Sequence, residues 1–275
     1  MFDFFKIICV IKSGGDLASG VAASLFKAGF TVIMLEIENP MAVRRTVAFS
    51  SAISEGFIEI EGVMGKKTEL NEIIHRVGNE KFDFIPVITD EKWQTIGRIK
   101  PFATIDAIVN KQNHGTKIDE APFVIALGPG FTAKKDCHAV IETNRGHNLG
   151  RIIYEGTAET NTGRPGDIAG YTYERVVRTD VAGIFRTEYK IGDKIKKGDL
   201  FGHVSLKPFK AQIDGVVRGI LPDRTIVKYY TKLGDIDPRN DACYCYTISD
   251  KSRAIGRAVL EAILIRLKTY APAGL

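Results

Sequence analysis

Short apolar runs alternate with amphipathic stretches through the first half of the chain. The runs are rich in β-branched residues and too short for helices, which is typical of buried strands. They lie at residues 7–11, 31–35, 84–88, 104–109 and 123–127. The clearest helical spacing of apolar residues between them begins at Leu17 and ends before Gly29, a helix C-cap glycine. Strands that alternate with helices predict a mostly parallel sheet covered by helices.

Three further stretches complete the prediction for this half. Residues 57–63 alternate between apolar and polar positions, as an edge strand does, and residues 69–77 have the spacing of a short amphipathic helix. A longer helix is predicted up to Gly56, with Asn39 as its N-cap and Pro40 at its first position.

From Val181 the pattern changes to short β-branched strands separated by Gly-Asp turns, and it repeats after 32 positions. Matching pairs are Gly183 and Gly215, Arg186 and Arg218, Lys196 and Lys228, and Gly202 and Gly234. An ungapped repeat of this kind predicts two halves of one β-barrel or sandwich. Residues 176–240 resemble the biotinyl/lipoyl-type barrel-sandwich hybrid. Carrier domains of that type present a Met-Lys-Met hairpin, whereas residues 207–210 read Lys-Pro-Phe-Lys, so no covalent biotin or lipoate is expected.

The predicted fold is therefore α/β: a Rossmann-like parallel sheet domain, a β-rich barrel-sandwich-hybrid domain and a C-terminal helix. The helix is expected from Ser249, a suitable N-cap, to about Lys268, and its second apolar side at Leu260 and Leu264 predicts burial on both sides. The predicted parts are a nucleotide-binding domain at 1–127, a glycine-rich loop and strand connection at 128–175, the barrel at 176–247 and the helix at 248–275.

Composition narrows the classes of function. The chain has 275 residues, a net charge of +5 and no basic run with interleaved aromatics, so nucleic-acid binding is not expected. No apolar run is long enough to cross a membrane, and no membrane partner is expected. The cysteines show neither zinc spacing nor a disulfide framework, which predicts a reducing, cytoplasmic location. They are Cys9, Cys137, Cys243 and Cys245.

The stretch from Lys6 to Glu36 has the plan of a dinucleotide-binding βαβ unit. Its turn reads Ser13, Gly14, Gly15 and Asp16, with serine in place of the first glycine of the G-x-G-x-x-G/A fingerprint. Glycines and a helix N-terminus suit a pyrophosphate, and Glu36 lies where a carboxylate can bind ribose hydroxyls. The alternative is a turn that only caps a helix, because Asp16 would repel a phosphate.

Several other residues are candidates for ligand contacts. Gly128 and Gly130 follow a buried strand and could form an anion-binding nest. Arg145 lies in the glycine-rich connection and either faces an anionic ligand or pairs with Glu142 or Asp136.

Arg44 and Arg45 could reach a ligand phosphate near Glu36, or form a solvated pair. Asp106 and His147 are the loose candidates for proton transfer, and no metal site is expected. Cys243 and Cys245 would point the same way from a strand, with buried thiols as the ordinary interpretation.

Three long phrases carry a resemblance to one family. They are SGGDLASGVAASLFKAGFTVIMLEIENPMAVRRTVAFSSA, LGPGFTAKKDCHAVIETNRGHNLGRIIYEGTAETNTGRPG and KLGDIDPRNDACYCYTISDKSRAIG. The chain resembles the YqeB-like accessory proteins of the selenium-dependent molybdenum hydroxylase system over nearly its full length. Lys12-Ser13 stands where these proteins commonly have Arg-Gly.

The resemblance implies a maturation factor that helps to mature or insert the cofactor of a hydroxylase. Its expected ligand is a small anionic nucleotide, either NAD(P) or molybdopterin dinucleotide. Its expected partners are the client hydroxylase or the maturation proteins of that client, and a homo-oligomer is left open. Two alternatives are a free-standing NAD(P)-dependent oxidoreductase and a scaffold without catalysis.

Overall fold

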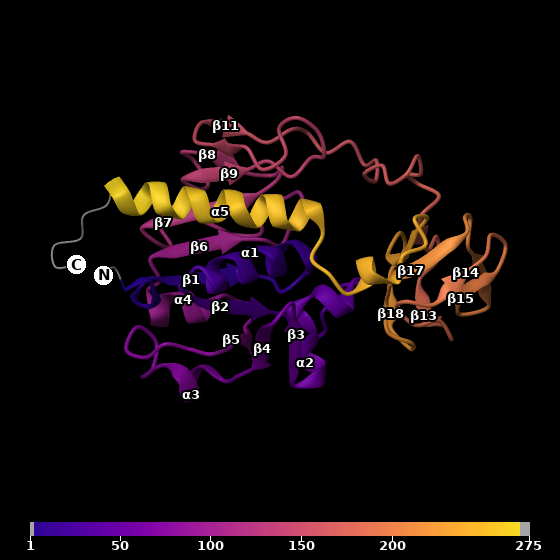
Figure 1. Ribbon diagram of the computed structural model, residues 1–275, viewed down its shortest axis with the longest axis horizontal. Coiled ribbons are helices and arrows are strands. Elements are labelled where there is room, and N and C mark those ends of the chain that lie inside the picture. Colours follow the sequence, from indigo (N-terminus) through magenta and orange to yellow (C-terminus); the bar gives the residue numbers. More distant parts are fainter. Residues whose placement is uncertain (1–2, 270–275) are drawn as a thin grey trace. The chain divides into compact units, whose positions relative to one another are not determined.

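The computed structural model describes residues 3–269, and the chain divides into two compact units (Figure 1). None of the helices in this range is both long and apolar enough to cross a membrane. Unit 1 comprises the chain up to Pro40, Ala48–Asn161 and the chain from Ile248, and unit 2 comprises Met41–Val47 and Thr162–Thr247.

A nine-stranded sheet forms the centre of unit 1. In spatial order its strands are β10 (Ile152–Ile153), β9 (Ala139–Ile141), β7 (Phe123–Leu127), β6 (Ala103–Asp106), β1 (Ile8–Lys12), β2 (Thr31–Glu36), β5 (Ile85–Thr89), β4 (Val63–Lys67) and β3 (Phe57–Ile60). All neighbours from β9 to β4 are parallel, and only the outermost strands β10 and β3 pair antiparallel. The predicted α/β fold with a large, mostly parallel sheet is confirmed.

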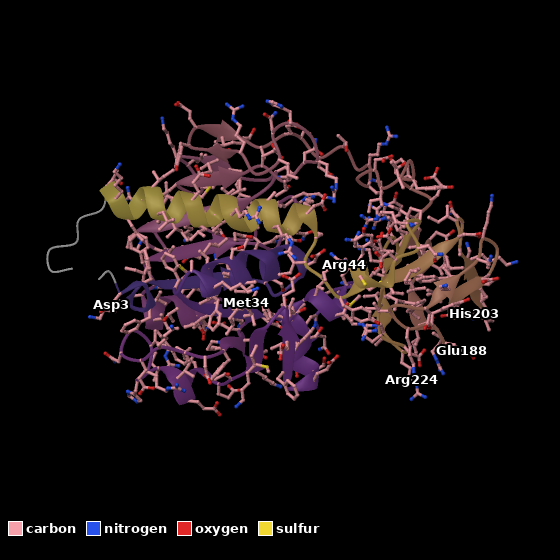
Figure 2. The ribbon with its side chains drawn as sticks, in the orientation of Figure 1. Asp3, Met34, Arg44, Glu188, His203 and Arg224 are labelled. Carbon is pink, nitrogen blue, oxygen red and sulfur yellow. The ribbon has the colours of Figure 1, made fainter. Side chains whose placement is uncertain are left out.

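Helices cover both faces of this sheet, which explains why the central strands are apolar at almost every position. On one face, Val10 and Ile33 belong to a buried cluster with Ile73 of α3 (Leu70–Ile73) and Ile96 of α4 (Gln94–Ile99). Helices α1 (Asp16–Lys27) and α5 (Asp250–Thr269) lie against the other face (Figure 1). Met34, at the middle of β2, is completely buried (Figure 2).

The predicted helix between Pro40 and Gly56 is wrong. Tertiary hydrogen bonds replace helical ones here: the Phe49 N–H donates to Ser19 Oγ at 2.8 Å and the Ser50 N–H donates to Gly14 O at 2.9 Å. The segment instead forms 3₁₀ turns at Arg45–Val47 and Phe49–Ser51 and the short helix α2 (Ala52–Glu55).

The two predictions that follow along the chain, an edge strand and a short helix, agree better with the structure. Residues 57–63 contribute the edge strand β3, as expected, and a turn leads from it into β4. The helix predicted over 69–77 is helical only in α3, after which hydrogen-bonded turns continue past Val77 to Glu80. A small two-stranded sheet of β8 (Thr132–Ala133) and β11 (Gly156–Thr157) lies in the glycine-rich connection.

Helices α1 and α5 pack with their backbones in close approach. A Cβ atom on Gly256 would lie 2.5 Å from the carbonyl oxygen of Gly20, so a larger residue would force the helices apart. The predicted N-cap is confirmed, because the Ser252 N–H donates to Ser249 Oγ at 3.1 Å. The predicted burial on both sides of this helix is wrong, since Leu264 is 42% exposed.

Unit 2 is built from two four-stranded antiparallel sheets. Their orders are β12 (Val176–Arg178), β19 (Lys232–Asp237), β17 (Gly215–Ile220), β14 (Lys194–Ile195), and β16 (Lys207–Lys210), β15 (Leu200–Val204), β13 (Gly183–Arg186), β18 (Ile226–Val227). Strands β13, β14 and β15 begin at residues 183, 194 and 200, and β17, β18 and β19 begin 32 positions later, at 215, 226 and 232.

The two halves exchange strands, which makes them one folding unit. The second strand of each half pairs with the first strand of the other, since β14 pairs with β17 and β18 pairs with β13. Phe185 and Phe201 stack in the shared core, with ring centroids 6.4 Å apart. The predicted internal repeat is therefore confirmed in the positions of the strands.

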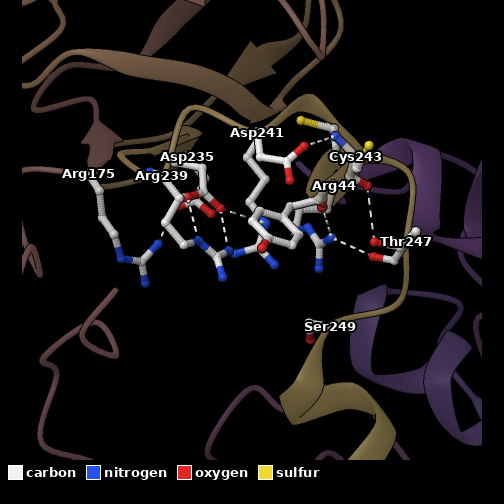
Figure 3. A network of polar contacts seen from close by, with 12 residues as sticks. Arg44, Arg175, Asp235, Arg239, Asp241, Cys243, Thr247 and Ser249 are labelled. Atoms are coloured by element: carbon white, nitrogen blue, oxygen red, sulfur yellow. Dashed lines mark hydrogen bonds and ion pairs between the residues drawn. The ribbon is translucent and has the colours of Figure 1, made fainter. Parts of the chain in front are cut away.

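A charged network follows the end of β19 (Figure 3). Asp237 is completely buried and accepts hydrogen bonds from Arg239 at 2.6 and 2.9 Å, while Arg175 pairs with Asp235. Burial acts to raise the pKa of Asp237, but the hydrogen bonds and charge of Arg239 and the charge of Arg218 hold it below its ordinary value.

The expectation that Cys243 and Cys245 point the same way from a strand is wrong. Both lie in the 3₁₀ helix Ala242–Cys245, where residues two apart lie on different sides. Cys245 is buried and its thiol lies 3.7 Å from Val217 O, whereas Cys243 is exposed and its N–H is bound by Asp241 (Figure 3).

Candidate functional site

Most of the polar residues singled out in unit 1 lie where the parallel strands end. The order β5-β2-β1-β6-β7-β9 is that of doubly wound sheets, in which the direction of winding reverses between β1 and β6. Lys12 and Asp106, the last residues of these two strands, are partners in the parallel register. Ligands of open α/β sheets bind at this switch point. This edge is therefore the candidate site of unit 1.

The glycine turn between β1 and α1 is shaped by its contacts. Ser13 has a φ of 91°, a value that favours glycine. The serine that stands at the first glycine position of the fingerprint is therefore strained. A Cβ atom on Gly14 would lie 2.6 Å from the backbone nitrogen of Ser50. A Cβ atom on Gly15, the N-cap of α1, would meet only Ser13 Oγ, at 3.6 Å. The turn is therefore packed at Gly14 and open at Gly15, where the first N–H groups of α1 begin.

The carboxylate of Glu36 supports this turn from the end of β2. One of its oxygens accepts the Gly14 N–H at 2.7 Å and the other accepts the Ile37 N–H at 2.8 Å. Burial raises the pKa of Glu36 above its ordinary value, although these N–H groups and the Ser13 hydroxyl act to lower it. Glu36 thus fixes the turn.

This raised pKa makes a pH dependence testable. The folded state holds the Glu36 proton more tightly than the unfolded state, so its contribution to stability is present at low pH and is lost as pH rises through the raised pKa. Urea unfolding of the wild type and of Glu36→Gln from about pH 4 to about pH 7 measures it. We expect the difference in unfolding free energy, wild type minus variant, to fall with rising pH. A difference that rises with pH would contradict a raised pKa.

A buried lysine lies beside the turn. The Lys12 side chain is completely buried, and its amine donates to Thr116 Oγ1 at 2.7 Å and to Glu120 Oε2 at 2.8 Å. The Thr116 hydroxyl donates in turn to Asp106 Oδ2 at 2.6 Å. The amine also lies 5.8 Å from the ring centroid of Trp93, at the N-terminus of α4. These side chains thus form one connected polar network at the switch point.

Sequence reasoning missed this network as a unit. In the sequence alone, Asp106 is only a loose candidate for proton transfer, and Lys12 is only a departure from a family pattern. Thr116 and Glu120 lie more than 100 positions after Lys12 and carry no motif. The one available signal was a lysine at the end of an otherwise apolar strand, which requires a buried partner.

The second glycine turn, after β7, is a packing turn in this structure. The Gly128 N–H donates to Ile141 O at 2.8 Å, and Gly128 has a φ of 75°. Gly130 has a φ of 108°, and a Cβ atom there would lie 2.7 Å from the backbone of Lys111 and of Gln112. Both glycines are required where they stand, and the turn places Lys111 at the same edge of the sheet as β7.

Arg145 binds the start of the C-terminal helix. Its guanidinium donates to both carboxylate oxygens of Asp250, at 2.6 and 2.8 Å. His147, the other loose candidate for proton transfer, is exposed in the same loop. In the described range 3–269, no group of three or more His, Cys, Asp and Glu side chains is arranged to hold a metal ion.

Arg44 and Arg45 belong to unit 2, whereas Glu36 belongs to unit 1. The Arg44 guanidinium donates to the carbonyl oxygens of Tyr244 and Thr247, at 3.0 and 3.1 Å (Figure 3), and Arg45 donates to Ile220 O at 3.0 Å. Arg44 is only 5% exposed, so the alternative of a solvated arginine pair is wrong for this residue.

Each unit also has an open cavity away from the switch point. The cavity in unit 2 has a volume of about 810 Å³. Its lining includes Glu188 and His203, whose side chains are labelled in Figure 2. One cavity in unit 1 has a volume of about 440 Å³ and lies between Glu142 and Thr160 in the glycine-rich connection. The carboxylate of Glu142 is engaged there by the N–H groups of Asn144 and Glu159, both at 2.7 Å.

These features define a two-unit α/β protein, with a polar switch-point site in a doubly wound unit and a second unit of two repeated β-rich halves. The chain is 48% identical over 258 residues to "Uncharacterized protein YqeB" of Escherichia coli (strain K12). The match covers 94% of this chain and 47% of that protein, so the chain spans about half the length of this relative. The predicted resemblance to YqeB-like proteins is confirmed. No protein-family model matches the chain.

Similarity to solved structures is slight. The ectoine utilization protein EutE (DoeB) of Ruegeria pomeroyi shares 20% identity and a TM-score of 0.22, over 30% of this chain and 26% of that one. A succinylglutamate desuccinylase/aspartoacylase of Rhodobacter sphaeroides shares 16% identity and a TM-score of 0.24, over 51% and 60%. Scores this low carry no argument about fold or function.

Proposed function

We propose that unit 1 binds a nucleotide-bearing anionic ligand, NAD(P) or molybdopterin dinucleotide, and that the protein is an accessory maturation protein of a selenium-dependent molybdenum hydroxylase. One observation carries the ligand proposal: the glycine turn, Glu36 and Lys12 converge at the switch point of a sheet with the doubly wound order.

The chemistry of the turn supports this ligand class. The space at Gly15 lets a phosphate approach the first N–H groups of α1, which have no partner within the helix. The Glu36 carboxylate accepts two backbone N–H groups and the Ser13 hydroxyl, which leaves one lone pair for a ribose hydroxyl. The Lys12 amine lies at the end of β1, where Glu120 balances its charge.

The accessory role rests on the YqeB-like resemblance. In this proposal unit 2 is a biotinyl/lipoyl-like barrel that carries no covalent group and contacts the client hydroxylase or its maturation proteins. Its repeated halves with exchanged strands support that assignment.

A survey of retained small molecules tests the ligand proposal. The protein is purified under mild conditions and denatured, and the released molecules are identified by mass spectrometry. We expect a dinucleotide in an amount comparable to that of the protein, or its uptake when NAD⁺, NADP⁺ or molybdopterin dinucleotide is added. A protein that neither releases nor takes up any of these would contradict the proposal.

A further inference from the structure

Lys251 is held at the carboxyl edge of unit 1 by both of its neighbours in the first turn of α5. Asp250 is bound through two hydrogen bonds by Arg145, in the loop after β9. Ser252 Oγ donates to Asp16 Oδ1 at 2.9 Å, at the first residue of α1. The Lys251 side chain therefore starts from a backbone that is fastened to both sides of the site, and it is partly buried.

The groups that act electrostatically on the Lys251 amine are two cations and two carboxylates. The cations are Arg145 and Lys111, and the carboxylates are Asp16 and Glu142. Asp16 already accepts a hydrogen bond from Ser252, and Glu142 accepts two backbone N–H groups. Among residues 3–269, none forms an ion pair or a hydrogen bond with the Lys251 amine.

An ammonium group that is partly removed from water, and that has no ion pair within residues 3–269, is a suitable partner for an anion. We propose that Lys251 binds the phosphate or diphosphate group of the ligand of unit 1, beside Arg145 and Lys111. Arg145 holds Asp250, so it orients the first turn of α5 as well as adding positive charge. This inference rests on the proposed function, because it takes the same nucleotide-bearing ligand. It adds the residue that binds the negative charge of the phosphate group.

The acid–base behaviour of Lys251 agrees with this geometry. Burial lowers the pKa of Lys251, and the positive charges of Arg145 and Lys111 lower it further, against the opposing effect of Asp16 and Glu142. A larger fraction of this amine is therefore unprotonated and reactive at neutral pH than for an exposed lysine. A bound phosphate would raise the pKa again.

Reductive labelling with pyridoxal 5′-phosphate tests the inference, since this probe carries both an aldehyde and a phosphate. Its aldehyde condenses with the unprotonated amine, releasing water, and borohydride reduces the imine to a stable secondary amine. Peptide mapping is expected to show Lys251 labelled faster than Lys268, an exposed lysine in the last turn of the same helix. Inorganic pyrophosphate should slow the labelling of Lys251 and leave that of Lys268 unchanged. Equal rates, or no protection, would overturn the inference.

A second measurement separates this inference from the proposed function. Calorimetric titration with the dinucleotide that the wild type takes up should show affinity reduced roughly 10- to 100-fold in Lys251→Met and unchanged in Lys268→Met. Equal affinity of wild type and Lys251→Met would overturn the role of Lys251 and leave the nucleotide proposal standing. Protection of Lys251 by pyrophosphate in a protein that binds no dinucleotide would support the anion site and refute the proposed nucleotide ligand.

Discussion

A Gly15→Val variant is expected to lose dinucleotide binding while it keeps its fold. The added Cβ atom has only Ser13 Oγ nearby, at 3.6 Å, and the backbone of Gly15 is extended, with a φ of −67°, which valine also adopts. The side chain would fill the space where a phosphate must approach the N–H groups of α1. We expect at least tenfold weaker binding by calorimetry, the equivalent of about 1.4 kcal/mol, with a change in melting temperature of only a few degrees at most.

Gly14→Ala is the matched control for this variant. Its Cβ atom would lie 2.6 Å from the Ser50 backbone nitrogen, so we expect a lowered melting temperature, whatever its effect on binding. Gly97→Ala, at a helical position with open space, should neither weaken dinucleotide binding nor lower the melting temperature. Wild-type affinity in Gly15→Val would show that no ligand approaches the turn.

The second large effect is expected on stability. Lys12→Met should lower the free energy of unfolding by about 3 kcal/mol or more, because it removes one partner of a buried ion pair. The variant would leave Glu120, whose Oε1 is already buried without a partner in the structure, facing an uncharged side chain. Chemical denaturation measured by circular dichroism gives the change directly.

Two further variants show whether the effect belongs to the buried pair. Adding Glu120→Gln to Lys12→Met should recover part of the lost stability, because the uncompensated charge is removed. Lys6→Met breaks an exposed pair with Asp3, at 3.6 Å, and should cost less than about 1 kcal/mol. A Lys12→Met variant as stable as Lys6→Met would mean that Lys12 contributes no buried interaction.

The parts of the fold that local pattern determines were predictable from the sequence. Strand β7 matches the run of apolar residues at 123–127, because a strand buried on both faces has no polar side. The repeat in unit 2 was visible because each half folds into the same strands. The helix expected before Gly56 does not form, because the Phe49 and Ser50 N–H groups donate to α1 and to the turn before it instead of to their own segment.

The candidate site was predictable only where a motif marks it. The turn and Glu36 follow a known spacing, and the structure places Glu36 on the Gly14 N–H. The partners of Lys12 and of Arg145 lie more than 100 positions away, and no local pattern encodes such pairs. Lys251 had no signal at all, because its environment is created by residues from three distant segments.

The central claim is that a nucleotide-bearing ligand binds at the switch point of unit 1, and the chain carries its own reporter there. Trp93 is the only tryptophan, and its ring centroid lies 5.8 Å from the Lys12 amine. Titration with NAD⁺, NADP⁺ and molybdopterin dinucleotide, followed by Trp93 fluorescence, should give a saturable change for one of them in the wild type and none in Gly15→Val. Binding detected by calorimetry that leaves Trp93 fluorescence unchanged, or an equal change in Gly15→Val, would contradict the claim.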